Sequence, residues 1–289
     1  MLHKIIFVLS EYYFEFVNLH INILEQKVIP YRTIIELKEA AHFRDFFTKT
    51  SPCAVSFMQT LFITDTPTVL DTLLQAGFYT IALYHEHNKE CSFPGARYAV
   101  EDIFQLEYCS YVEAYRRLAG IPWDILETDR LFVRESTLSD IPDFYRIYEN
   151  PAITDHMEPL FEDPEEEKAY LQDYIKQVYG FYGFGIWTVI LKESGQIIGR
   201  AGLNIREGYD LPELGFVIDT SCQNRGLAFE VCSAILKYAS DKLEFDRLQA
   251  FVKKENLASK KLLKKLGFAY SRKALENDRE YLLYTVELK

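Results

Sequence analysis

Short apolar runs alternate with amphipathic stretches through the second half of the chain. Runs bounded by Gly, Pro or polar clusters are typical of strands, and they fall at Leu131–Glu135, Gly185–Leu191, Gln196–Asn204, Glu213–Asp219, Arg247–Val252 and Glu280–Leu288. Apolar residues recur at helical spacing over Ile141–Glu149, from Asp163 to Gly180, and from Ala228 to Lys242. Strands interleaved with helices predict an α/β fold.

The first part of the chain is less regular. Apolar runs predict strands at His3–Leu9, Thr60–Thr64, Phe78–Leu83 and Tyr98–Val100, and a helix at Pro67–Ala76. This alternation predicts a small α/β domain with a parallel sheet. Helical periodicity stops at Gly120 and Pro122, so we expect two domains, at 1–122 and 123–289. The short linker predicts that the two domains pack together.

Composition and charge narrow the function. The formal charge of −11 at pH 7 argues against a nucleic-acid partner, which would need a broad basic face. An acidic surface suits cationic amines, although it more often only keeps a protein soluble. Five cysteines without a C-x-x-C pair indicate reduced thiols in a cytoplasmic protein rather than disulfides or a metal site. Glu11 and Glu15 interrupt the apolar N-terminus, so we expect neither a signal peptide nor a membrane span.

One motif in the second half carries chemistry. The sequence Gln-Asn-Arg-Gly-Leu-Ala at 223–228 lies between the predicted strand that begins at Glu213 and the helix that begins near Ala228. A glycine turn lets the backbone approach an anion closely, and the unpaired N–H groups of the first helical turn point toward that anion. The motif therefore predicts a phosphate-binding turn, although such turns often only connect a strand to a helix.

A second motif follows the next predicted strand. Asn256 and Ser259 precede a lysine-rich helix, and Leu266-Gly267-Phe268 ends it with glycine where a left-handed cap is expected. The order of strand, QNRGLA, helix, strand, Asn-x-x-Ser helix and Leu-Gly-Phe resembles the Gcn5-related N-acetyltransferase (GNAT) superfamily. Within that superfamily it is most similar to the branch that acetylates ribosomal-protein N-termini and small amines. The resemblance spans roughly residues 128–289.

The resemblance implies a mixed, mostly antiparallel sheet flanked by helices, and an acetyl-CoA-dependent N-acetyltransferase acting on a primary amine. Coenzyme A and the amine are then the partners, no metal is implied, and a homodimer is left open. The cofactor-binding positions that it implies are Phe216, Val217, Ile218, Gln223, Arg225, Gly226, Leu227, Ala228, Asn256 and Ser259. The alternatives are that Arg225 points into solvent and that Asn256 and Ser259 only cap a helix.

Glu213 is the candidate catalytic residue, because several family members carry a carboxylate at the start of the central strand. By resemblance it deprotonates the ammonium through water or binds the cationic acceptor; a solvated strand-end charge is the alternative. Related enzymes often place a tyrosine, the acid for the leaving thiolate, where this chain has Leu263. Tyr270 and Tyr284 remain candidates for that acid. The missing tyrosine motivates a second hypothesis, a non-catalytic acyl-CoA-binding sensor or scaffold.

The first domain faintly resembles a degenerate haloacid-dehalogenase-like phosphatase. Thr64 ends a predicted strand where that family places a phosphate-binding Ser or Thr, and Glu101-Asp102 follow a later strand as its metal-binding acids would. The first strand, however, runs into Ser10-Glu11, without the Asp-x-Asp that forms the aspartyl phosphate. We therefore expect this domain to be non-catalytic.

Overall fold

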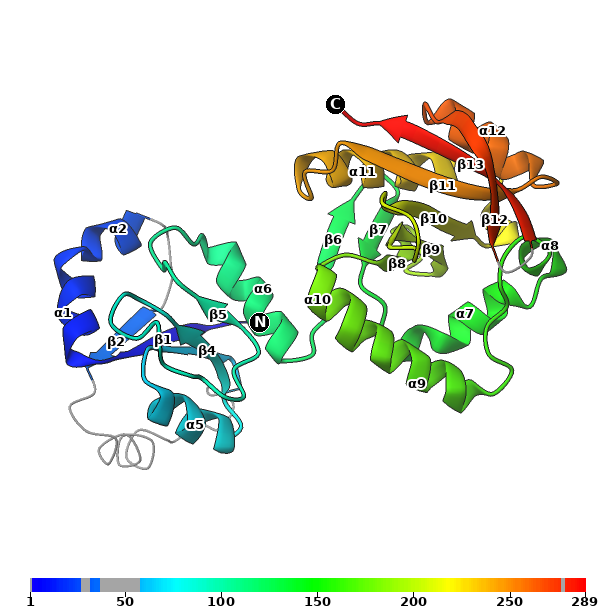
Figure 1. The fold of residues 1–289 in the computed structure, drawn as a ribbon. Coiled ribbons are helices and arrows are strands. Elements are labelled where there is room, and N and C mark those ends of the chain that lie inside the picture. The colour runs from blue at the N-terminus through cyan, green and yellow to red at the C-terminus, as the bar shows by residue number, and fades with distance from the viewer. Residues whose placement is uncertain (1, 27–31, 37–57, 277–278) are drawn as a thin grey trace. The chain divides into compact units, whose positions relative to one another are not determined.

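The computed structural model describes residues 2–26, 32–36, 58–276 and 279–289. Contacts within the chain divide it into two compact units, 1–123 and 124–289 (Figure 1). In the described residues, no helix combines the length and the apolar character that a membrane span requires. The four cysteines among these residues are all free thiols.

The first unit is built on a five-stranded parallel sheet in the order β2-β1-β3-β4-β5, which confirms the predicted parallel layer. Its elements are β1 (Lys4–Leu9), α1 (Glu11–Leu19), α2 (Ile21–Gln26), β2 (Arg32–Glu36), β3 (Thr60–Thr64), α5 (Pro67–Gln75), β4 (Tyr79–Leu83), β5 (Ala99–Val100) and α6 (Tyr108–Leu118). Nearly all residues of β1, β3 and β4 are buried, as in parallel sheets whose two faces are covered. The elements α1, α2 and β2 were not predicted.

The second unit is built on an eight-stranded sheet in the order β12-β13-β11-β10-β9-β8-β7-β6. Every neighbouring pair is antiparallel except β10 and β11, which confirms the mixed, mostly antiparallel sheet. Its strands are β6 (Asp124–Glu127), β7 (Leu131–Arg134), β8 (Ile186–Leu191), β9 (Ile197–Asn204), β10 (Glu213–Ile218), β11 (Arg247–Lys253), β12 (Ala269–Glu276) and β13 (Arg279–Glu287). Its main helices are α7 (Ile141–Tyr148), α8 (Pro151–Thr154), α9 (Pro164–Tyr174), α11 (Leu227–Asp241) and α12 (Leu257–Lys265).

Helices cover both faces of this second sheet (Figure 1). Because side chains alternate along a strand, Val217 packs with α7 and α9 while its neighbour Ile218 packs with α11. Thr137 and Asp140 form a capping box before α7. These helices hold β10 between two cores, and β10 is the strand along which the site is built.

Two local expectations were wrong or incomplete. The helix that begins after Asp163 does not end at Gly180: it continues through a π-turn, Ile175–Tyr179, and α10 (Gly180–Tyr182), and ends at Gly183 with φ of 73°. The strands β6 and β12 were not predicted. They lie at the two edges of the sheet, and half of the residues of β6 and most of those of β12 are exposed. An edge strand lacks the apolar run that marks a buried one.

Candidate active site

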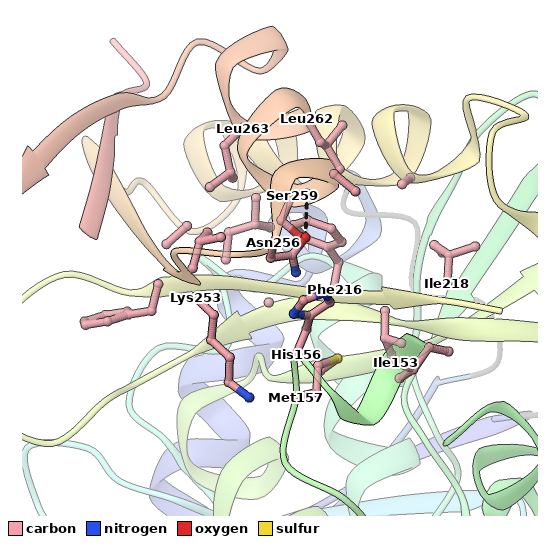
Figure 2. A pocket seen from close by; sticks show the side chains of 18 of the residues that line it. Ile153, His156, Met157, Phe216, Ile218, Lys253, Asn256, Ser259, Leu262 and Leu263 are labelled. Carbon is pink, nitrogen blue, oxygen red and sulfur yellow. Dashed lines mark hydrogen bonds between the residues drawn. The ribbon is translucent and has the colours of Figure 1, made fainter. Parts of the chain in front are cut away.

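A cavity lies between β10 and β11 because these two strands separate after one pair of residues. β10 pairs with β9 along its whole length, but it pairs with β11 only at Glu213 opposite Gln249. Beyond that point the edge of β10 that faces β11 has no strand partner in the described part of the chain. The cavity has a volume of about 930 Å³ and is lined by β10, β11, α12 and the turn at 223–228 (Figure 2). That volume suits a ligand of cofactor size.

The turn at 223–228 forms the part of the cavity where α11 begins. Gly226 precedes the helix with φ of 79°, and Asn224 has φ of 59°, both in the left-handed region. A Cβ on Gly226 would meet only Arg130 Nη2, at 3.6 Å, so backbone conformation rather than crowding favours glycine there. The first N–H groups of α11 have no acceptors within the helix and are available to an anion.

A brace outside the cavity holds this turn in place. Arg130 donates from Nη1 to the carbonyl oxygen of Arg225 at 3.0 Å and pairs with Glu230 in the first turn of α11. Glu230 also accepts from the Thr128 hydroxyl at 2.5 Å. Burial alone would raise the pKa of Glu230, but these hydrogen bonds outweigh burial and lower its pKa. The Glu230 carboxylate, in the first turn of α11, therefore bonds to Arg130 and Thr128 outside the cavity. Arg130, Glu230 and Thr128 together form this brace.

The predicted residues of the turn take different positions. Gln223, Gly226, Leu227 and Ala228 line the cavity, but Arg225 is exposed and does not line it. The Gln223 side chain donates from Nε2 to the carbonyl oxygen of Ile218 at 2.9 Å, which ties the turn to the end of β10. Gln223 therefore shapes the turn, and the side chain of Arg225 lies outside the cavity.

The start of α12 closes the opposite wall of the cavity. Asn256 caps the helix, accepting at Oδ1 from the N–H of Ser259 at 2.9 Å, and both residues line the cavity (Figure 2). The side-chain NH2 group of Asn256 donates no hydrogen bond to another described residue. At the other end, Gly267 has φ of 91° and the N–H of Phe268 bonds to the carbonyl of Leu263, as predicted for a glycine cap. Leu263, at the position where related enzymes often have the tyrosine acid, is apolar and fully buried, so this position supplies no acid.

Glu213 lies in a charged cluster where β10 and β11 part. Arg206 holds its carboxylate with two bonds, Nε to Oε2 at 2.6 Å and Nη2 to Oε1 at 3.1 Å, and also pairs with Glu276. The backbone N–H of Phe251 donates to the same carboxylate. Burial raises the pKa of Glu213, and the bonds from Arg206 and Phe251 only partly offset it. Two carboxylates share one guanidinium, so the cluster keeps an excess negative charge.

The segment that contains α8 also lines the cavity, and no motif in the sequence indicated it. Asn150 donates from Nδ2 to the Thr220 hydroxyl at 2.9 Å, after β10, and Lys253 on β11 donates from Nζ to the carbonyl of Asp155 at 2.9 Å. The segment is thus tied to both strands that separate. His156 follows α8 and lines the cavity (Figure 2).

The remaining candidates lie away from the cavity. Tyr270 and Tyr284 line a separate surface hollow with Lys260 and Lys264, so they are not placed to protonate a leaving group beside β10. Within the lysine-rich segment, three residues line the main cavity: Lys253, Lys261 and Lys265.

In the first unit, Ser10 lies in a closed polar cluster around Asp65. Asp65 follows β3 and is buried; it accepts from the Ser10 N–H at 2.8 Å and the Ser10 hydroxyl at 2.5 Å. His85 Nε2 lies 3.2 Å from the same carboxylate. Asp102 accepts from the N–H of Phe104 in its own turn. Among the described residues, no group of three or more His, Cys, Asp or Glu side chains is placed to hold a metal ion.

Known proteins resemble the second unit in both sequence and fold. The acetyltransferase (GNAT) domain family matches residues 130–269. The uncharacterized N-acetyltransferase YjdG of Bacillus subtilis (strain 168) is 28% identical over 112 residues, 38% of this chain and 67% of that protein. The ribosomal protein uS5-alanine N-acetyltransferase of Escherichia coli (strain K12) is 29% identical over 162 residues, 52% of this chain and 80% of that protein.

A solved structure agrees at the level of the fold. RimL, the ribosomal L7/L12 alpha-N-protein acetyltransferase, matches with a TM-score of 0.50 at 15% identity, over 57% of this chain and 94% of its own. The resemblance of the first unit to haloacid-dehalogenase-like phosphatases is not supported by these similarities. The separated strands, the glycine turn before α11 and the matched residues agree: residues 130–269 form an acetyltransferase domain of the GNAT family, and the protein is an N-acetyltransferase.

Proposed function

We propose that the protein transfers the acetyl group of acetyl-CoA to a primary amine, of a small molecule or of a protein or peptide N-terminus, by direct attack. The observation that carries this proposal is the separation of β10 from β11. It leaves an unpaired strand edge that leads from Glu213 to a helix N-terminus inside one cavity. An extended thioester arm needs such an edge, and a pyrophosphate needs such a helix start.

The cofactor is proposed to lie along the edge of β10. Its pyrophosphate meets the backbone N–H groups from Arg225 to Ala228, where the dipole of α11 favours negative charge. Its pantetheine amides pair with the backbone of 216–218 as an added strand would, and an N–H there donates to the thioester oxygen as negative charge develops on it. Asn256 and Ser259 supply polar contacts from the opposite wall; in Asn256 the amide not used for capping is available.

Glu213 is proposed to bind the acceptor. The cluster of Glu213, Arg206 and Glu276 carries one more negative than positive charge, so it attracts an ammonium without leaving a lone buried carboxylate. The bound ammonium first loses one proton to water, and the resulting amine attacks the thioester carbonyl carbon. The C–S bond breaks, the nitrogen gives up a second proton and the sulfur takes up one, so that N-acetylamine and the free thiol of coenzyme A leave. The overall acidic charge of the chain is consistent with cationic acceptors.

The second candidate function is a non-catalytic acyl-CoA-binding sensor or scaffold. The observation in its favour is that Leu263, at the position where relatives often carry the tyrosine acid, is apolar and fully buried.

Acetyl-CoA consumption separates these functions. The full chain is incubated with acetyl-CoA and spermidine, kanamycin or a peptide beginning with alanine, and thiol release is followed while acetylated product is identified by mass spectrometry. Thiol release that depends on one of these amines supports the transferase. Tight acetyl-CoA binding by calorimetry without turnover supports the sensor, and absence of binding contradicts both.

A further inference from the structure

We propose that His156 is a catalytic residue of this acetyl transfer: its imidazole takes the proton from the attacking amine and delivers it to the departing thiolate. The inference rests on the proposed function, because it presupposes that the thioester lies beside β10. It gives the chain an acid for the leaving thiolate, a role that Leu263 cannot fill.

The first support is the way the chain holds His156 over the separated strands. The bond from Asn150 to Thr220 fixes one side of the segment to the turn after β10, and the bond from Lys253 to Asp155 fixes the other side to β11. The N–H of His156 bonds to the carbonyl of Ile153 at 3.0 Å, which orients the residue at the end of α8. The segment therefore crosses the gap along which the thioester arm is proposed to lie.

The second support is the state of the imidazole. Its ring points into the cavity, between Asn256 at the start of α12 and Phe216 on β10 (Figure 2). Nδ1 is buried and has no hydrogen-bond partner, and Nε2 makes no hydrogen bond to any described residue. A buried imidazole nitrogen normally has a hydrogen-bond partner, because burying it without one is unfavourable. A ligand in the cavity is the partner that this ring lacks.

The third support is that Glu213, the carboxylate predicted to be catalytic, is already engaged by neighbouring groups. Glu213 is held by two bonds from Arg206 and one from the Phe251 N–H, so it anchors charge more readily than it exchanges protons. His156 is the one histidine among the described residues that line the cavity. Imidazole is the side chain that ordinarily gains and loses a proton near neutral pH, which is what a group acting first as base and then as acid requires.

The proposed step balances in protons and electrons. The amine lone pair forms the C–N bond while the thioester π electrons move to oxygen, and the neutral imidazole takes one N–H proton. When the carbonyl re-forms, the C–S bond breaks and its electron pair stays on sulfur. The imidazolium returns the proton to that sulfur, so His156 ends neutral and coenzyme A leaves as the thiol.

Charged residues from several elements line the same cavity as His156. They are Glu158 on its own segment, Arg206 and Glu207 in the loop after β9, Glu213 on β10, Lys253 on β11, Lys261 and Lys265 on α12, and Glu276 on β12. Because the base must be neutral, turnover should fall as pH drops and the imidazole becomes protonated. That acidic limb should depend on His156.

A chemical modification experiment tests the placement without an acceptor. Diethyl pyrocarbonate modifies unprotonated imidazoles, and peptide mass spectrometry measures the modification rate of each histidine in the full chain, with and without saturating coenzyme A. Coenzyme A is expected to slow modification of His156 at least fivefold, as an order of magnitude for burial under a ligand, and to leave the exposed His3 unchanged. If calorimetry shows bound coenzyme A but His156 reacts at its original rate, this inference is overturned and the proposed function stands. If coenzyme A does not bind, the proposed function itself fails.

Kinetics test the chemistry with the best amine among spermidine, kanamycin and the alanine peptide. His156→Gln keeps a polar side chain of similar size and is expected to lower kcat by about 10²–10⁴-fold, to remove the acidic limb, and to keep the Kd of coenzyme A within about twofold. His3→Gln removes an imidazole outside the cavity and controls for nonspecific loss. A fall in kcat below about threefold, or an unchanged acidic limb, overturns the inference. Tyr281 on β13 also lines the cavity. A large loss in Tyr281→Phe with none in His156→Gln would also overturn the inference and assign the proton to Tyr281.

Discussion

The two units each join a strand to a helix beside a carboxylate, but only one of these junctions is open. In the first unit β1 passes into α1 through Ser10, and the Asp65 carboxylate bonds to the N–H and hydroxyl of Ser10 at the helix start. In the second unit β10 passes into α11 through residues 219–226, and the helix start faces a cavity of about 930 Å³. The protein itself supplies the anion in one case and leaves room for a ligand in the other.

The difference comes from where the carboxylates are held rather than from the helices. Asp65 is fixed at the helix start by Ser10, by the Thr66 hydroxyl and by His85. In the second unit the first-turn carboxylate, Glu230, is drawn away by Arg130, and Glu213 is held at the start of β10 by Arg206. A helix N-terminus attracts any anion, so its own side chains decide whether a phosphate can enter.

In the comparison of the two junctions, the largest expected effect concerns Glu213. Glu213→Gln keeps the shape but removes the negative charge, so we expect kcat/KM for the amine to fall about 10–100-fold, as for loss of a charged hydrogen bond of about 1.5–3 kcal/mol. The Kd of acetyl-CoA should stay within about twofold. Steady-state kinetics over amine concentration also separates the two roles of Glu213. If it anchors the acceptor, its replacement raises KM; if it is a general base, its replacement lowers kcat. A loss below about threefold would return Glu213 to a structural role.

Gly226→Asp makes the open junction resemble the closed one. It sets a carboxylate at the start of α11, as Asp65 does at α1, and repels the pyrophosphate, so the Kd of coenzyme A should rise at least about tenfold, or 1.4 kcal/mol. Gly226→Asn is the matched control, because asparagine has nearly the same shape and, like Asn224, tolerates a positive φ. Calorimetry should show a clearly smaller loss for the asparagine variant. Equal losses would attribute the effect to strain, and unchanged affinity in both would remove the phosphate from this turn.

The local parts of this site could be predicted from the sequence, but its assembly could not. The turn with Gly226, the cap at Asn256 and the left-handed Gly267 depend on residues within a few positions of each other, so pattern and capping chemistry indicate them. The separation of β10 from β11 depends on pairing across the whole sheet. The bonds of Arg206 to Glu213 and Glu276 likewise join separate strands through one loop residue. His156 follows a four-residue helix without periodicity, so nothing nearby in the sequence directs it into the cavity.

Asp65→Asn should weaken the closed junction without affecting catalysis. The amide is neutral and replaces a buried acceptor that takes two bonds from Ser10, so we expect the first unit to lose about 1–3 kcal/mol of unfolding free energy. Asp71→Asn, at an exposed helical position, is the control and should change little. Hydrogen exchange of the amides in β1 and β3 would measure the loss for that unit alone. Unaltered protection there would show that Asp65 does not hold the junction.

Glu230→Gln tests the brace, with a smaller effect that depends on pH. Because the pKa of Glu230 is lowered in the folded protein, its charge stabilises the fold above the unfolded pKa of about 4.3, and this contribution disappears as pH falls through the folded pKa. The variant should therefore be less stable than the parent at pH 7, by about 1 kcal/mol, and the difference should shrink as pH falls below the unfolded pKa of about 4.3. Denaturant unfolding at a series of pH values measures it, with the exposed Glu193→Gln as control. A difference that does not decrease with falling pH would contradict the role of the charge.

The last prediction is that an activity is absent: the first unit should not hydrolyse phosphate esters. A phosphate would have to displace Asp65 from the start of α1. This is the switch point of the sheet, where a ligand would ordinarily bind, because the chain leaves β1 toward β2 on one side and leaves β3 toward β4 on the other. The Ser10 hydroxyl is committed to Asp65, and no aspartate follows β1 to form a phosphoenzyme. We propose instead that this unit is structural or restricts which acceptors reach the second unit.

Incubation of the full chain with p-nitrophenyl phosphate and Mg²⁺ should give the background rate, and Asp102→Asn should leave that rate unchanged. Magnesium-dependent turnover that survives Ser10→Ala but is lost in Asp102→Asn would show that the closed junction opens and that the first unit is an enzyme after all.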